Sequence, residues 1–235
     1  MIEITLDGPG KNALGTTLME ATRERLRAAG GAPVLLSGAG DAFSAGLNLK
    51  EVVSLDQAGM TRFLGLLEDL VATLFAYPGP TVAAVNGHAI AGGCVLALCC
   101  DHRVVRAEPR LRIGLNEVAL GVPFPPRTLA AVMYRVPPRS RDEVLLGAEL
   151  HAPEAALRLG LVDEIAVDPV ARARERLALL ASHPAAAYAA TKTTLRGALV
   201  AGSDVHTRQL RDTIVPAWCM PAARERLADA VRPRR

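Results

Sequence analysis

Short apolar runs separated by glycine turns and helical repeats make up the first half of this 235-residue chain. Residues 2–6 alternate apolar and polar, which predicts an edge strand. Residues 33–38 and 81–85 are mostly apolar and bounded by turn residues, which predicts two buried strands. Further strands are predicted over residues 102–107 and 111–113.

Apolar positions at helical spacing lie between these strands. They predict a helix over residues 55–76, another over residues 92–100, and a first helix that is capped by Thr16 or Thr17 and ended by Gly30–Gly31. The apolar side of the first helix is predicted to hold Leu18, Ala21 and Leu26. Strands and helices thus alternate, which indicates an α/β fold with ligands at the glycine loops between strand and helix, such as the loop of residues 43–48.

The pattern becomes mostly helical after residue 122, with one strand signal at residues 162–167. Predicted helix starts are Pro126, Ser140, Pro153 and Pro184, and predicted helix ends are Gly147 and Gly160. We therefore divide the chain into a body, residues 1–167, and a helical region, residues 168–235. The apolar faces of the latter are too broad to remain hydrated, so it is expected to pack on the body or on a neighbouring subunit.

Composition excludes some classes of function. Half of the residues are hydrophobic but only 3% are aromatic, and the net charge is +3, from 27 basic and 24 acidic residues. With so few aromatic residues and so little excess charge, nucleic acid is not an expected partner.

Cysteines and the apolar segments indicate a cytoplasmic protein. The four cysteines have no spacing typical of a disulfide framework or a metal site, so reduced thiols are expected. The first residues lack the charged and apolar regions of a secretory signal. The uncharged run over residues 81–100 is broken by Asn86 and by Gly92–Gly93, so no membrane span is expected.

Glu117 is the best candidate for a catalytic base. It is the only ionisable residue in the segment IGLNEVALG, residues 113–121. A carboxylate in such apolar surroundings either has a raised pKa or is stabilised by a positive charge or hydrogen-bond donors. A lone buried glutamate is also often a structural cap or salt-bridge partner, so the context of Glu117 decides its role.

Two glycine-containing turns provide that context. They are SAGL, residues 44–47, and AGGC, residues 91–94, and both look able to direct backbone N–H groups at an oxyanion. Gly92 begins a predicted helix, where the first N–H groups have no partner within the helix. Each turn alone is more often a packing feature. Their combination with Glu117 favours an enzyme.

The ordered set of motifs resembles the crotonase superfamily of enoyl-CoA hydratases and isomerases. The motifs are GAGDAFSAG at residues 38–46, TVAAVNG at 81–87, AGGC at 91–94, GLV at 160–162 and TK at 191–192. The resemblance implies a crotonase-like ββα spiral core followed by a C-terminal helical region used in oligomerisation. It also implies a homotrimer or a dimer of trimers.

The resemblance assigns roles to individual residues. The two oxyanion-hole amides fall on Leu47 and Gly92, and the acyl-CoA thioester would also be contacted by Lys11, Ala45, Gly46, Asn48, Leu49 and Val95. Within that set, Lys11 would meet a CoA phosphate. Coenzyme A enters as part of the substrate, and neither a separate cofactor nor a metal is expected. Asn48 stands where the family usually has Asp.

Val95 is the departure that bears on the reaction. Hydratases of the family carry a glutamate at that position and another at the position of Glu117, and the two share the work of activating water. An apolar residue at the first position is typical of the mitochondrial-type Δ3,Δ2-enoyl-CoA isomerases, which the IGLNE run also resembles. The first hypothesis is therefore an isomerase. The alternatives are an enoyl-CoA hydratase or other lyase of this fold, and a weakly catalytic oligomer that binds CoA esters.

Overall fold

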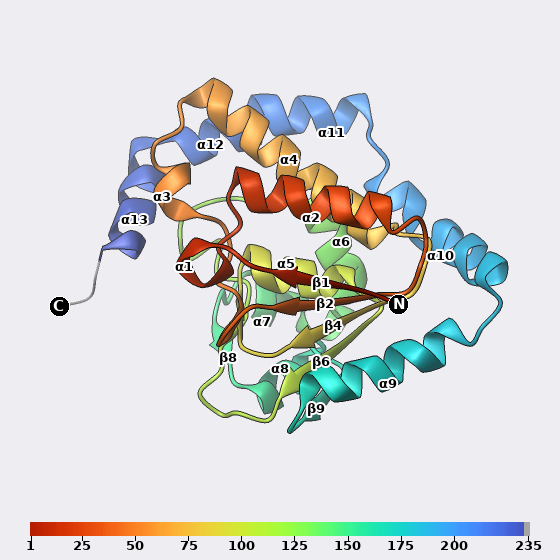
Figure 1. Ribbon diagram of the computed structural model, residues 1–235. Coiled ribbons are helices and arrows are strands. Elements are labelled where there is room, and N and C mark those ends of the chain that lie inside the picture. The colour runs from red at the N-terminus through yellow and green to blue at the C-terminus, as the bar shows by residue number, and fades with distance from the viewer. Residues whose placement is uncertain (233–235) are drawn as a thin grey trace.

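Two sheets organise the part of the chain that the computed structural model describes, residues 1–232 (Figure 1). The larger sheet is fully parallel and runs in the order β1 (Ile2–Leu6), β2 (Val34–Gly38), β4 (Thr81–Val85), β6 (His102–Arg106) and β9 (Glu164–Ala166). The smaller sheet runs β3 (Ala42–Ser44), β5 (His88–Ile90), β7 (Ile113–Gly114) and β8 (Leu150–His151), and only β8 is antiparallel.

A repeated ββα unit connects the two sheets. Each unit has one strand in the larger sheet, the next in the smaller sheet, and then a helix: β2 and β3 precede α3 (Leu49–Val52) and α4 (Gln57–Phe75), β4 and β5 precede α5 (Gly92–Cys99), and β6 and β7 precede α6 (Pro126–Arg135). The predicted α/β class is confirmed. The repetition brings three strand-to-helix turns to one region of the molecule.

The smaller sheet was not predicted from the apolar pattern. Its strands are two or three residues long, too short for an alternation of apolar and polar residues to be read. The segment predicted as a loop at residues 43–48 begins inside β3, and the strand predicted at residues 111–113 is displaced to Ile113–Gly114. The longer strands and helices for which bounds were predicted agree with the structure to within a few residues.

The first long helix, α2 (Thr16–Ala28), differs from its prediction in its cap and its buried face. Its N-cap residue is Gly15, which has no side chain to accept a hydrogen bond from the first turn. Glu51 from another part of the chain does so instead: it accepts hydrogen bonds from the Thr16 N–H at 3.1 Å and from the Thr16 hydroxyl. The buried residues are Met19, Thr22 and Leu26. Leu18 is only half-buried and Ala21 is exposed, because the side that packs toward α4 is the one that carries Met19, Thr22 and Leu26.

Helix α5 is buried along its whole length. It is packed between the smaller sheet, α4 and α6, and all of its eight residues are inaccessible or nearly so. Small side chains make this close packing possible: an added Cβ on Gly93 would lie 2.4 Å from the Ser44 carbonyl oxygen. The N-terminal end of α5 is therefore rigidly placed beside the turn that follows β3.

The remaining helices complete the body. They are α1 (Pro9–Asn12), a 3₁₀ turn (Pro138–Ser140), α7 (Arg141–Leu145), α8 (Pro153–Leu159), α9 (Pro169–Ala181), α10 (Ala185–Val200), α11 (Asp204–Gln209), a π-helical turn (Leu210–Ile214), α12 (Val215–Cys219) and α13 (Pro221–Val231). Helix α9 covers the face of the larger sheet opposite α2 and α4 (Figure 1). Helix α12 packs on α4 and α13 on α3, so the helical region packs on the body as expected. Within residues 1–232, no helix combines the length and apolarity needed to cross a membrane.

A buried ionic cluster anchors α10 at the C-terminal end of α5. Asp101 accepts hydrogen bonds from Lys192 at 2.8 Å, Arg196 at 2.7 Å and the Tyr188 hydroxyl at 2.8 Å. Lys192 also donates to the carbonyl oxygen of Gly79 at 3.0 Å. This lysine belongs to the TK motif, and here it joins two parts of the chain 91 residues apart.

Candidate active site

A cavity of about 410 Å³ lies at the N-terminal end of α5. Its walls come from the turns after β3, β5 and β7, and from α3, α4, α6, α12 and α13. Six of the predicted site residues line it: Ala45, Leu47, Leu49, Gly92, Val95 and Glu117. Residues far apart in the sequence are thus brought to one apolar space.

The two predicted oxyanion turns touch each other. Gly46 has a φ of +89°, and an added Cβ there would lie 2.8 Å from the Ile90 carbonyl oxygen and 3.5 Å from the Gly92 nitrogen. A Cβ on Gly92 would in turn lie 3.3 Å from the Leu47 side chain. Only glycine permits this approach at position 46. The amides of Leu47 and Gly92 therefore lie in adjacent segments of backbone.

Both amides are available to a ligand. Among the described residues, neither the Leu47 nor the Gly92 N–H donates a hydrogen bond to another protein group. Leu47 is flanked by two bonds to Leu14: the Leu14 N–H donates to Gly46 O at 2.7 Å, and the Asn48 N–H donates to Leu14 O at 3.0 Å. Gly92 is the first residue of α5, where the helix dipole favours negative charge.

Ala91 sets the direction in which α5 begins. Its φ of 48° and ψ of −121° are rare for a residue with a side chain and store strain. Two hydrogen bonds stabilise this strained conformation: the Ala91 N–H donates to Gly114 O at 2.8 Å, and the Ala91 carbonyl accepts from the Val95 N–H at 2.9 Å. The first of these connects the Gly92 turn to the strand that precedes Glu117.

Glu117 is buried and unpaired. It is 7% exposed, and its Oε2 atom has no hydrogen-bond partner within residues 1–232. Burial raises the pKa of Glu117 to about 8, opposed only by a hydrogen bond from its own backbone amide. The turn around it is closed by the Val122 N–H, which donates to the Glu117 carbonyl at 3.1 Å. Both the protonated and the ionised form of this carboxyl group are therefore accessible near neutral pH.

The surroundings of Glu117 are apolar except for Asn116. Val95, at the position discussed above, is 1% exposed and lines the same cavity. Burial, followed by the nearby Glu117, raises the pKa of Cys94 to about 12, so this thiol is neutral. Asn116 lines the cavity too, and its buried Oδ1 has no partner among the described residues. Sequence reasoning did not single out Asn116.

Three predicted binding residues lie outside the cavity lining. Gly46 contributes only backbone behind Leu47, as described above. Asn48 caps α3, accepting from the Glu51 N–H at 3.4 Å. Lys11 lies at the surface with an exposed ion pair to Asp41 at 3.3 Å. Such an exposed pair is weak, so Lys11 remains able to exchange Asp41 for another anion.

The inner end of the cavity was missed by sequence reasoning. It is formed by Leu67, Phe124, Thr128, Trp218 and Leu227. Leu67 and Leu227 belong to ordinary helical repeats, which mark them only as core residues. Trp218 is the single tryptophan of the chain, and this rarity could have marked it as a candidate site residue. The indole Nε1 of Trp218 donates to the Pro123 carbonyl at 2.9 Å.

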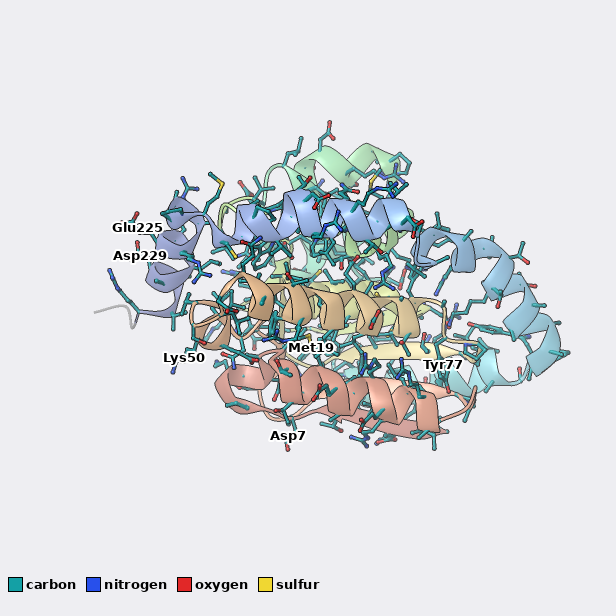
Figure 2. All side chains as sticks on the ribbon, turned by 90° about the horizontal axis from the view of Figure 1, so that it is seen from above. Asp7, Met19, Lys50, Tyr77, Glu225 and Asp229 are labelled. Carbon is teal, nitrogen blue, oxygen red and sulfur yellow. The ribbon has the colours of Figure 1, made fainter. Side chains whose placement is uncertain are left out.

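The outer end of the cavity is polar and exposed. Asp229, Ala230 and Arg232, at the end of α13, line it. Figure 2 shows Glu225 and Asp229 on α13 at the same end of the molecule as Lys50 of α3. No group of three or more metal-binding side chains comes together within residues 1–232. The arrangement therefore suits an elongated ligand with an apolar end and a polar end.

Comparisons with known proteins agree with this geometry. The profile of the family described as enoyl-CoA hydratase/isomerase matches residues 1–215. Over 134 residues the chain is 34% identical to the mitochondrial enoyl-CoA delta isomerase 1 of Mus musculus, covering 57% of this chain and 46% of that protein. Over 156 residues it is 39% identical to a putative enoyl-CoA hydratase of Thermus thermophilus, covering 65% of this chain and 59% of that protein. The alignments thus span about half the length of these relatives.

Solved structures extend the similarity to nearly the whole chain. The human mitochondrial delta3-delta2-enoyl-CoA isomerase superposes with a TM-score of 0.90 at 25% identity, covering 97% of this chain and 92% of that one. An enoyl-CoA hydratase from Mycobacterium ulcerans superposes with a TM-score of 0.80 at 31% identity, covering 92% and 94%. The predicted crotonase fold is confirmed.

Proposed function

The chain belongs to the enoyl-CoA hydratase/isomerase family, and we propose that it is a Δ3,Δ2-enoyl-CoA isomerase with Glu117 as its one base. The observation that supports this choice most strongly is the isolation of Glu117: it is buried, has a pKa of about 8, and faces a cavity where Val95 replaces the second carboxylate. One base is sufficient to move a proton within a substrate, whereas adding water usually employs two.

In the proposed reaction, the thioester oxygen of a 3-enoyl-CoA accepts hydrogen bonds from the Leu47 and Gly92 amides. Negative charge grows on that oxygen as the proton leaves C2, so these bonds strengthen toward the transition state. Each such donor typically contributes about 3–4 kcal/mol of transition-state stabilisation. The helix dipole of α5 acts on the same charge through Gly92.

Glu117 moves the proton in two steps. Its ionised carboxylate takes the C2 proton, and the electrons of the broken C–H bond form a dienolate whose oxygen is held by the two amides. The protonated Glu117 then returns the proton to C4, the double bond settles between C2 and C3, and the carboxylate is regenerated. A base with a pKa near the working pH performs both transfers well.

The CoA portion would run toward the outer end of the cavity. We propose that Ala45, Gly46, Asn48 and Leu49 contact it, the last from the first turn of α3. Lys11 would meet a phosphate after releasing Asp41.

One observation favours hydration as a second candidate. The buried Oδ1 of Asn116 has no partner among the described residues, and it lines the cavity beside Glu117, so the two side chains offer two acceptors to a water molecule. An amide oxygen can hold such a water but cannot take its proton at neutral pH. Hydration would therefore rest on Glu117 alone and be slow.

The test is a direct comparison of two reactions. Purified protein is given a 3-enoyl-CoA and, separately, crotonyl-CoA, while the absorbance of the conjugated thioester is followed. We expect a gain of absorbance with the first and little loss with the second. Glu117→Gln is expected to lower isomerisation by roughly 10³-fold, with Glu20→Gln, an exposed glutamate on α2, as the control. Near-normal turnover by Glu117→Gln, or fast hydration by the wild type, contradicts the assignment.

Two further measurements separate the alternatives. Val95→Glu restores the second carboxylate, and it is expected to raise hydration relative to isomerisation. Calorimetric titration with a saturated acyl-CoA tests binding without turnover. If the ester binds but neither reaction proceeds, the protein is the weakly catalytic CoA-ester-binding protein considered above. If no CoA ester binds, both enzyme assignments fail.

We also propose that the protein forms a homotrimer or a dimer of trimers through its C-terminal helices. Large apolar side chains remain exposed there: Leu179, Leu195, Leu199 and Val205 are between 37% and 62% exposed. Apolar surface of this kind is commonly covered in an assembly. Light scattering of the purified protein gives the mass in solution, and a monomer would contradict this proposal.

A further inference from the structure

Building on the proposed isomerase function, we propose that Trp218 is the end wall of the acyl channel and sets the longest acyl chain that the enzyme accepts. The residue comes from α12, about a hundred positions after Glu117 in the sequence. It touches none of the atoms that would react. Its proposed role is to determine specificity.

A series of hydrogen bonds and cavity-lining residues connects the proposed reacting centre to Trp218. Val95 lies one turn into α5 from Gly92, and Val122 is bonded through its N–H to the Glu117 carbonyl. Pro123 follows directly and accepts the indole N–H of Trp218. Both valines and the tryptophan line the cavity. An acyl chain whose thioester lies on the two amides would therefore pass the valines and meet the indole ring.

This end of the cavity is closed. Trp218 and Leu67 are each 3% exposed and Thr128 is 2% exposed. Helix α12 packs against α4, which carries Leu67, and α4 is joined to α6 by hydrogen bonds from Thr128 to Glu68. Three packed helices thus surround the inner end. The outer end, by contrast, carries the exposed residues Asp229 and Arg232.

The inner end is also apolar. Its one hydroxyl belongs to Thr128, which donates it to the buried carboxylate of Glu68 at 2.8 Å. The Thr128 and Arg127 amides occupy the Glu68 oxygens as well, at 2.8 and 2.9 Å. An acyl chain with a polar tail would lose its hydration there without finding a free partner among these groups.

The indole ring is fixed in place. Its hydrogen bond to Pro123 would be lost if the ring swung aside, leaving a buried donor and acceptor unsatisfied. Its large flat surface is buried where α12 packs against α4. A rigid wall predicts a sharp length limit: affinity should rise roughly fourfold per methylene as the channel fills, then fall once the chain reaches the ring.

The experiment measures binding as a function of chain length. Butyryl-, hexanoyl-, octanoyl-, decanoyl-, lauroyl- and palmitoyl-CoA are titrated into the wild type, Trp218→Ala and Trp218→Phe by calorimetry. The optimum of Trp218→Ala is expected to move to chains longer by at least roughly two methylene groups, because the ring volume is removed. Met220→Ala, two residues away at an exposed position, is the control and should keep the wild-type optimum.

Trp218→Phe keeps a ring but loses the bond to Pro123, so its length limit should broaden without a large shift. Melting temperatures of all variants check folding, and Trp218→Phe keeps the test available if Trp218→Ala does not fold. An unchanged length profile in both variants would overturn the inference. A profile that rises without any limit in the wild type would do so too.

The binding series is independent of the reaction. A shifted profile with no isomerisation by the wild type supports the end wall and rejects the proposed function. Isomerisation that depends on Glu117 with unshifted profiles does the reverse. The kcat/KM values of the matching 3-enoyl esters should follow the same optimum as binding.

Discussion

Two buried carboxylates stand at opposite ends of α5 and have opposite environments. Asp101 follows the C-terminal end, with a side chain 8% exposed, and Glu117 lies by the N-terminal end, 7% exposed. Burial alone would raise the pKa of Asp101, but Lys192 and then Arg196 outweigh it and hold that pKa below the usual value. Glu117 has no such partner in the described residues, and its pKa rises to about 8.

This difference in partners explains why one carboxylate has a structural role and the other is suited to a reactive one. Both carboxylates lose most of their hydration on folding, so their charged and hydrogen-bonding partners determine the direction of each pKa shift. Asp101 is held ionised by two cations and a hydroxyl, and it keeps α10 on the body. Glu117 is left near the point where both protonation states are accessible, as a proton shuttle requires.

Removing the charge of Asp101 should have the largest effect on stability. Asp101→Asn leaves Lys192 and Arg196 buried without their counter-ion, which is expected to cost about 3–5 kcal/mol of unfolding free energy. Because the folded-state pKa of Asp101 is lowered, the wild-type contribution is present above about pH 4 and is lost as pH falls through the folded value. Urea unfolding at neutral and acidic pH measures both. Equal stability of variant and wild type at neutral pH would contradict the structural role.

Removing the charge of Glu117 should instead increase the stability of the folded protein. Its folded-state pKa is raised, so the folded protein binds more protons than the unfolded chain between about pH 4.5 and 8, and stability falls as pH rises through that window. Glu117→Gln removes this penalty, and it is expected to be more stable than the wild type by roughly 3 kcal/mol at about pH 7, still more so at higher pH, and nearly equal at about pH 4. A variant less stable than the wild type at high pH would indicate an ion-pair partner.

The pH dependence of turnover should reveal the same group. If Glu117 is the base, kcat/KM for a 3-enoyl-CoA rises with an apparent pKa of about 8 and falls about tenfold per unit below it, so roughly a hundredfold is lost between pH 9 and pH 6. Binding of a saturated acyl-CoA over the same range is the control. A flat profile would mean that Glu117 is ionised throughout.

A single hydroxyl should have the smallest effect. Tyr188→Phe removes the O–H that donates to Asp101 at 2.8 Å, which is expected to cost about 1–2 kcal/mol of stability and leave turnover unchanged. Tyr134→Phe is a matched control, because the Tyr134 hydroxyl has no hydrogen bond within residues 1–232. A loss of turnover in Tyr188→Phe at full stability would connect the ionic cluster to the active site.

Local sequence signals were enough to predict much of the candidate site. A lone acidic residue in an apolar run marked Glu117, a glycine-containing loop after a predicted strand marked the turn of Leu47, and glycines at a predicted helix start marked that of Gly92. These signals lie within a few neighbouring residues. The structure places all three in one cavity, while their roles in catalysis stay predictions.

Contacts between residues far apart in the sequence could not be predicted. The bond between Trp218 and Pro123 joins residues 95 positions apart, and that between Lys192 and Asp101 joins residues 91 apart. Nothing in a helical repeat records which distant helix it will face, so Trp218 was not assigned to the cavity. The short strands of the second sheet were not predicted for a related reason, since each exists only because a neighbouring strand pairs with it.

The closing of the cavity by α12 and α13 has a consequence for biosynthesis. The two turns and Glu117 leave the ribosome well before Trp218 and Leu227, which line the same space. Without those helices the cavity would lack part of its wall, so the carboxyl group would be more hydrated and its pKa would lie nearer that of an ordinary glutamate. A nascent or incompletely folded chain thus carries every proposed catalytic group yet lacks the tuned base. Reactivity would switch on only when the last helices are in place.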